Sequence, residues 1–340
     1  MLKAKHTDLH PILKVSEWLL IAVTFTAAVF ALWQVLPINH SSIGALLLFQ
    51  ALQAIGLFVV PSLAVAYLWS DQPLVWLRWR KPEERCPMPD MSSQDHATAK
   101  VGAHSRQSAV RLSLLSMGII VTAIPLINCL VAWNGMLRLP ESMSGLEDLM
   151  RRMEEQAEQL LQHFLTYHDG AWWVLLLNLL VLAVLPAIGE ELTFRGVLQG
   201  LIAGRQQSAV RSQRSAVSNH VAVWVTAFVF SFIHFQFYGF VARMLLGALL
   251  GYALLWSGRI QYSMLMHATN NALSVILFYL STYVWHLPQA EMDALGTGQT
   301  WWITALSTPI MVGLIYLFFD CTCGAQREKT AALKEDRPQP

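Results

Sequence analysis

Charge is scarce in this sequence. Of its 340 residues only 13% are Asp, Glu, Lys or Arg and 55% are hydrophobic, whereas an ordinary soluble domain is roughly a quarter charged. The formal net charge is +1 and there is no basic tract, which argues against nucleic-acid binding because neutralising phosphates needs clustered Lys and Arg. The composition indicates a membrane protein.

Cysteine is also rare. Cys86, Cys129, Cys321 and Cys323 are too few and too scattered for a disulfide framework or a four-ligand zinc site. The N-terminus lacks a short apolar stretch followed by a small-residue cleavage site, so no cleavable signal peptide is expected. The first apolar run should therefore be kept as a membrane helix.

Long apolar runs are what the sequence does have. A hydrocarbon core about 30 Å thick is crossed by about 20 helical residues. Eight runs qualify: Trp18 to Leu36, Ile43 to Trp69, Leu112 to Trp133, Ala171 to about Ala203, Val221 to Phe237, Phe240 to Trp256, Ile260 to Tyr283 and Trp301 to Phe319. Tryptophans stand at many of their ends, as is typical of residues at the headgroup level. We predict an all-α polytopic membrane protein, one integral domain over residues 1–340, with about eight transmembrane helices and one amphipathic surface helix.

Lys and Arg are unevenly distributed among the loops. They concentrate near the N-terminus, after the second run, before the fifth run and in the C-terminal tail. With eight spans, all four segments fall on one side, which the positive-inside rule assigns to the cytoplasm. We expect an integral multi-pass protein of the bacterial cytoplasmic membrane with both termini cytoplasmic.

Two segments outside the spans have a character of their own. Residues 70–111, rich in Pro and polar residues, predict a flexible cytoplasmic loop. Residues 134–170 predict an outer segment, in which Ser144 and Glu147 form a capping box ahead of apolar residues at helical spacing. We expect an amphipathic helix on the outer surface, for which a packed linker without a substrate role is the simpler interpretation.

The fourth run places two carboxylates and an arginine in an apolar helix. Burying such charges is costly unless they are paired or functional. Glu191 and Arg195 stand at i and i+4, the favoured direction for an ion pair, while Glu190 points about 100° away. Glu191 is therefore predicted to be structural, and Glu190 is left free to act as a general base on water.

Two later runs supply polar partners. Phe230 and His234 share one helix face in the fifth run, and His267 and Asn271 share one in the seventh. At about 1.5 Å per residue from the cytoplasmic ends, Glu190 lies about 22 Å deep, His234 about 21 Å, His267 about 12 Å and Asn271 about 18 Å. The four side chains can therefore meet inside the bundle.

The fourth run poses a length problem. A helix from Ala171 to Arg205 would be about 50 Å long, well beyond the hydrocarbon core. We expect a kink at Pro186 and Gly189, a strong tilt, or projection beyond the membrane.

The three motifs together resemble a known family. Glu190-Glu191-x-x-x-Arg195, Phe230-x-x-x-His234 and His267-x-x-x-Asn271, in this order on apolar helices, resemble the CPBP family, the CAAX protease and bacteriocin-processing enzymes also called the Abi family. The resemblance covers about residues 171–281, a CPBP-like catalytic core, and implies an intramembrane glutamate-dependent endopeptidase acting on a peptide or protein at the membrane without a cofactor. It implies that Glu190 activates water with His234 assisting, and that His267 and Asn271 stabilise the oxyanion, with Glu191, Arg195 and Phe230 in supporting positions.

Two alternatives remain open from the sequence. In a zinc metallopeptidase, His234, His267 and a glutamate such as Glu190 would hold the metal. In a non-catalytic transporter, immunity protein or scaffold, the polar cluster would be a proton relay or a structural knot, since lone intramembrane histidines often only join helices.

Overall fold

The computed structural model describes residues 6, 7, 9–79, 95–204 and 216–335, and in these ranges every regular element is a helix. The predicted all-α fold class is confirmed. The α-helices are α1 (Pro11–Val35), α2 (Ile43–Gln53), α3 (Val60–Trp69), α4 (Pro73–Trp76), α5 (Asp95–Gly135), α6 (Ser144–Leu165), α7 (Trp172–Asn178), α8 (Leu185–Glu191), α9 (Gln199–Ile202), α10 (Ala216–Phe232), α11 (Phe240–Ser257), α12 (Ile260–Tyr279), α13 (Gln289–Asp293) and α14 (Trp301–Glu335).

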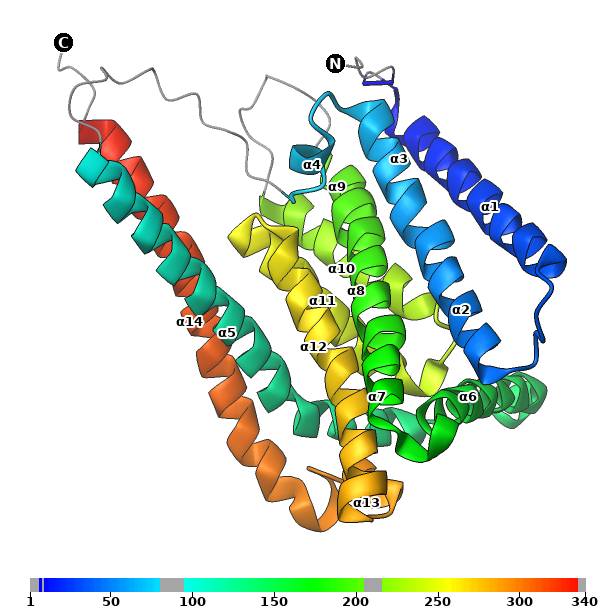
Figure 1. The fold of residues 1–340 in the computed structure, drawn as a ribbon. Coiled ribbons are helices and arrows are strands. Elements are labelled where there is room, and N and C mark those ends of the chain that lie inside the picture. Colours follow the sequence, from blue (N-terminus) through cyan, green and yellow to red (C-terminus); the bar gives the residue numbers. More distant parts are fainter. Residues whose placement is uncertain (1–5, 8, 80–94, 205–215, 336–340) are drawn as a thin grey trace.

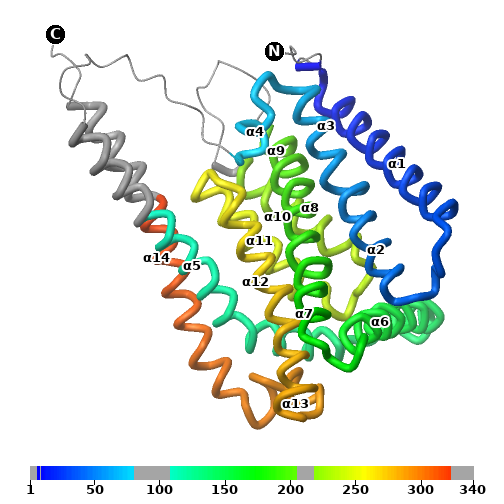
Figure 2. Tube along the Cα trace, viewed as in Figure 1, coloured from blue at the N-terminus to red at the C-terminus, as the bar shows by residue number. Residues whose placement is uncertain are grey.

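The long helices form a bundle with one helix across its end (Figure 1). Helices α5 and α14 pack along each other, and α5 also packs against α12 and α11. The amphipathic helix α6 crosses the lower end of the bundle, where α13 also lies, whereas α1 begins and α14 ends at the upper end (Figures 1 and 2). The first and last helices therefore begin and end on the same side of the bundle. That this side faces the cytoplasm stays a prediction.

Six helical stretches are long and apolar enough to cross a membrane within the described residues: Pro11–Val35, Ile43–Trp69, Ser108–Gly135, Trp172–Ile202, Phe237–Ser257 and Gly298–Thr322. The predicted count of eight is not confirmed. The fifth predicted run forms only a shorter apolar helix, Ser218–Phe232, and the seventh forms α12, which carries His267, Asn270 and Asn271 among its apolar residues.

Outer faces of the bundle carry the apolar side chains expected of a lipid-facing surface. Leu20 on α1 is 68% exposed and Trp301 at the start of α14 is 65% exposed. Such residues in water would be costly, so these faces fit a hydrocarbon environment.

The predicted loop over residues 70–111 is only partly described. Residues 80–94 lie outside the described residues, α4 occupies Pro73–Trp76, and α5 already begins at Asp95. A loop continuing to residue 111 is therefore wrong. The four prolines of the segment all precede Asp95, and half of residues 96–111 are the good helix formers Ala, Lys, Arg and Gln.

The fourth predicted run is a continuous helical rod whose regular geometry is interrupted twice. The π-helical turn η4 (Leu179–Val184) precedes Pro186, and a second one, η5 (Leu192–Leu198), follows Glu191. Proline lacks an N–H group and cannot continue an α-helical ladder, and single π-helical turns are frequent at functional sites. π-Helical turns thus flank α8 on both sides, and the expected kink, tilt or projection stays a prediction.

Glycine at position 189 brings this rod close to its neighbour. A Cβ atom there would lie 2.9 Å from Cβ of Phe58 in the π-helical turn η1 (Ala54–Val59), closer than such atoms approach. On the other side, buried Tyr262 and Met266 of α12 pack in one cluster with side chains of α5, α11 and α14. The rod thus packs closely against η1, and α12 packs against α5, α11 and α14 as well as against α8.

Candidate functional site

The two adjacent glutamates of α8 have different surroundings. Glu191 Oε1 lies 3.0 Å from Nη1 of Arg195, and neither side chain is exposed. The Arg195 guanidinium also donates through Nη2 to the carbonyl oxygen of Gly247 (2.9 Å) and lies 4.6 Å above the Phe230 ring. The ion pair expected from the i, i+4 spacing is present, and it fastens α8 and η5 to both α10 and α11.

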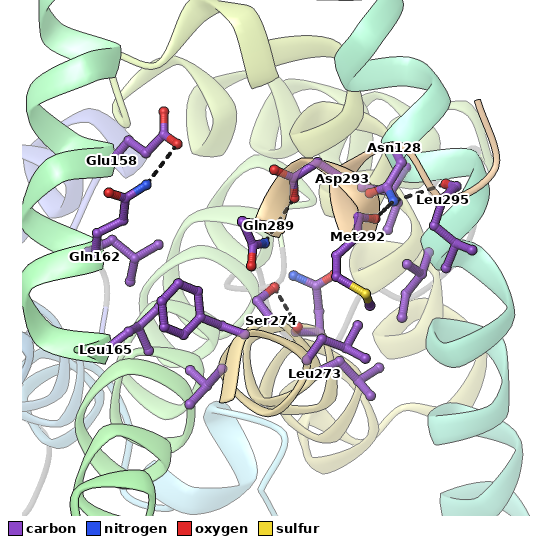
Figure 3. A pocket seen from close by; sticks show the side chains of 17 residues that line it. Asn128, Glu158, Gln162, Leu165, Leu273, Ser274, Gln289, Met292, Asp293 and Leu295 are labelled. Atoms are coloured by element: carbon purple, nitrogen blue, oxygen red, sulfur yellow. Dashed lines mark hydrogen bonds between the residues drawn. The ribbon is translucent and has the colours of Figure 1, made fainter. Parts of the chain in front are cut away.

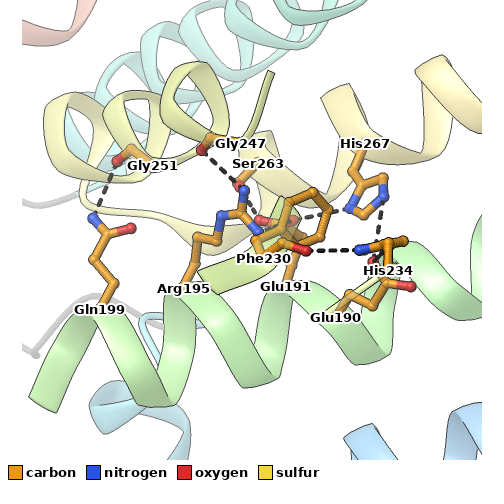
Figure 4. Close-up of polar contacts among 10 residues, drawn as sticks. All are labelled: Glu190, Glu191, Arg195, Gln199, Phe230, His234, Gly247, Gly251, Ser263 and His267. Atoms are coloured by element: carbon orange, nitrogen blue, oxygen red, sulfur yellow. Dashed lines mark hydrogen bonds and ion pairs between the residues drawn. The ribbon is translucent and has the colours of Figure 1, made fainter. Parts of the chain in front are cut away.

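Helix α12 adds two further contacts to Glu191. Ser263 donates its hydroxyl hydrogen to Oε2, and His267 Nδ1 lies 2.9 Å from Oε1 (Figure 4). The carboxylate is therefore bound by three side chains, which compensates its charge in the apolar interior. Because an ionised carboxylate only accepts hydrogen bonds, His267 carries a hydrogen on Nδ1, and its Nε2 atom faces the other way.

His234 does not lie inside a helix, as the sequence predicted, but just beyond one. Helix α10 ends at Phe232, and Phe235 adopts a left-handed conformation (φ 53°), which ends helical geometry. Nδ1 of His234 lies 2.6 Å from the carbonyl oxygen of Phe230. A carbonyl oxygen only accepts, so this ring also carries a hydrogen on Nδ1 and leaves Nε2 available.

Glu190 lies opposite both available imidazole nitrogens. Its Oε2 atom is 3.9 Å from Nε2 of His234 and 3.8 Å from Nε2 of His267, and this buried oxygen has no hydrogen-bond partner among the described residues. With neutral rings, all three converging atoms are acceptors, and their separations exceed a direct hydrogen bond. A water molecule, which donates two hydrogens, can bind two of these three acceptors at once.

Asn271 is close in sequence but is not part of this cluster of contacts. It stands one turn beyond His267, and its Oδ1 atom accepts a hydrogen bond from Nδ2 of Asn270 (3.3 Å). The structure thus brings together Glu190, His234 and His267, with Phe230 edge-on to both rings, and places Asn271 beside them on the same helix.

A pocket of about 280 Å³ borders the same helix (Figure 3). Side chains of α5, α6, α12 and α13 line it, mostly apolar ones, with polar groups such as Asn128 and Gln289. Asn270 is part of its wall, so the pocket reaches the turn of α12 that carries Asn271.

Sequence inspection missed three residues near the site. Ser263 binds Glu191, Asn134 of α5 holds the chain around Phe237, and Arg243 of α11 contacts Gln236. Ser263 lies one turn before His267 and could have been found from that spacing. Asn134 and Arg243 come from other elements, so no spacing could have indicated them.

The zinc alternative requires a group of side chains that could hold a metal ion. Across the described ranges, no three His, Cys, Asp or Glu side chains are grouped so that they could hold a metal ion. The zinc alternative stays a prediction that metal analysis must decide.

Comparison with known proteins finds a family match for a little under a third of the chain, in its second half. Residues 171–273 match the family model described as type II CAAX prenyl endopeptidase, Rce1-like. The matched range contains all three motifs, and a protease family favours an enzyme over a transporter or scaffold. No curated protein and no solved structure matches the chain.

Proposed function

We propose that this chain cuts a peptide bond inside the membrane. Its residues 171–273 belong to the Rce1-like family of type II CAAX prenyl endopeptidases. The family is one of proteases, and the apolar helices make the chain an integral membrane protein. The substrate is a peptide or protein at the membrane. The attacking water is activated by Glu190.

The observation that carries this proposal is the position of one oxygen atom. Glu190 Oε2 is buried without a hydrogen-bond partner among the described residues and faces the Nε2 atoms of His234 and His267 at 3.9 and 3.8 Å. A water held between Glu190 and His234 gives a proton to Glu190 as its oxygen attacks the carbonyl carbon. His234, oriented by the Phe230 carbonyl, fixes the second hydrogen of that water.

His267 and Asn271 stabilise the oxyanion that this attack forms. The Nδ1 hydrogen of His267 is committed to Glu191, so Nε2 donates only when the ring carries both protons. The amide of Asn271 joins after it turns from Asn270, and one such donor contributes about 3 kcal/mol in the transition state. The proton on Glu190 then passes to the leaving amine.

Replacing the proposed base tests the mechanism. Membrane-associated peptides are compared by proteomics in cells that carry the wild type, Glu190→Gln, or Glu155→Gln on the exposed surface of α6 as a matched control. Glu190→Gln keeps size and hydrogen bonding but removes the base, so we expect cleavage products to fall by about a hundredfold or more, and uncut substrates to accumulate. The control should resemble the wild type. Unchanged products in the Glu190 variant would rule out this residue as the base.

A further inference from the structure

The loop that carries His234 is held by an arginine from the next helix. Arg243, in the first turn of α11, donates through Nη1 to the carbonyl oxygen of Gln236 (3.2 Å) and through Nη2 to the side-chain Oε1 of the same residue (2.8 Å). Gln236 follows His234 by two residues. The guanidinium is therefore anchored beside the candidate site.

Arg243 differs from Arg195, Arg138 and Arg151 in having no close acid. Arg195 is paired with Glu191, and Arg138 and Arg151 are both paired with Glu147. Among the side chains that the structure describes, no carboxylate lies within 4.0 Å of Arg243, and both of its hydrogen bonds end on neutral oxygens. It interacts with Glu154 and Glu190 only at longer electrostatic range.

A half-buried cation without a carboxylate in direct contact is costly in an apolar bundle. Of the five N–H donors of an arginine, Gln236 takes two, so the others are available along the planar edge of the group. Such an edge binds a carboxylate through two parallel hydrogen bonds. The remaining donors of Arg243 thus match the shape and the charge of a carboxylate.

We propose that Arg243 is a specificity-determining residue that binds a carboxylate of the substrate close to the bond that is cut. The proposal rests on the peptidase function proposed above. The carboxylate is either the C-terminus of the substrate or an Asp or Glu side chain near the scissile bond. Bound there, it places the adjoining peptide bond near Glu190 and lowers KM.

A purely structural role makes a different prediction. If Arg243 only holds the loop through Gln236, then Gln236→Ala should show part of the effect of Arg243→Gln on substrate preference, since both changes remove the hydrogen bond to Oε1 and only the second also removes the one to the Gln236 carbonyl. If Arg243 binds substrate, Gln236→Ala keeps the preference for a charged substrate.

The test uses the substrate found in the Glu190 comparison, made as a synthetic membrane-anchored peptide that spans the cleavage site. Three forms are compared: the native peptide, one with a C-terminal carboxamide, and one with nearby Asp and Glu changed to Asn and Gln. With the wild type, we expect one neutral form to raise KM by about tenfold or more, as for loss of a charge-assisted hydrogen bond. The form that does so identifies the carboxylate.

The variants complete the test. Arg243→Gln should cleave charged and neutral forms with the same KM, Arg243→Lys should keep part of the difference, and Gln236→Ala should keep all of it. Equal KM values for all three peptides with the wild type would overturn the proposal, as would a cleaved substrate without a nearby carboxylate or a Gln236→Ala enzyme that has lost the preference. If Glu190→Gln leaves cleavage unchanged, the proposed function fails first, and that result is distinct from each of these.

Discussion

The imidazole of His267 lies between two carboxylates that are consecutive in the chain. Its Nδ1 atom is 2.9 Å from Oε1 of Glu191, and its Nε2 atom is 3.8 Å from Oε2 of Glu190. Glu191 is in turn fixed by Arg195 and Ser263. One glutamate thus orients the ring, and the other meets its available nitrogen.

This arrangement predicts different effects on stability for two neighbouring substitutions that both abolish cleavage. Glu191→Gln leaves the fully buried Arg195 without its carboxylate, and breaking a buried ion pair costs roughly 3–5 kcal/mol. We expect a clear fall in the melting temperature of the purified protein in detergent, together with lost cleavage. Glu190→Gln should lose cleavage but keep the wild-type melting temperature, because Oε2 of Glu190 has no hydrogen bond to lose. Equal destabilisation by both changes would contradict these different roles.

Asn134 is predicted to position the loop that carries His234. Its side chain is buried, donates to the Phe237 carbonyl (2.8 Å) and accepts from the Val241 amide (3.0 Å). Asn134→Ala should lower kcat more than it changes KM, and should speed amide hydrogen exchange in residues 234–241.

A matched control comes from the same helix. Asn128 also binds two backbone groups, the carbonyls of Met292 and Leu295, but these lie away from the loop. Asn128→Ala should destabilise the protein by a similar amount, about 1–3 kcal/mol for unsatisfied buried groups, and keep kcat. If both variants lose kcat equally, Asn134 acts only through overall stability.

The N-terminal part of α6 is predicted to respond to acid. Hydrogen bonds from Arg138 and Arg151 lower the pKa of Glu147 from 4.5 to about 2. A lowered folded-state pKa means that the stabilisation is complete above about pH 4.5 and is lost as the pH falls towards 2. Amide exchange in residues 138–151, corrected for its intrinsic pH dependence, should therefore lose protection over this interval. Glu147→Gln should show low protection throughout, and a wild type that stays protected at pH 2 would argue against the contribution.

Metal dependence is predicted to be absent. If Glu190 activates water directly, prolonged dialysis against a chelator should leave cleavage of the identified substrate unchanged, and metal analysis should find less than one zinc per chain. A stoichiometric zinc whose removal abolishes cleavage, and whose return restores it, would instead support the metallopeptidase alternative.

The sequence was sufficient for the class of fold and for the pairing of Glu191 with Arg195. Apolar runs of spanning length, and an acid and a base four residues apart on one helix, are local patterns whose consequences do not depend on distant segments. The three motifs could likewise be recognised without coordinates, because their order and spacing lie within the chain.

Tertiary structure alone decided which atoms of these residues meet. The end of α10 before His234 depends on Phe235, the tautomer of His267 on Glu191, and the position of Arg243 on Gln236, and none of these follows from a helical repeat. The amphipathic pattern predicted α6, but its place across the bundle end is set by packing (Figure 1). Helical periodicity determines which way side chains point only within one helix. The contacts of a buried site come from several helices, whose relative rotation and depth are set by packing.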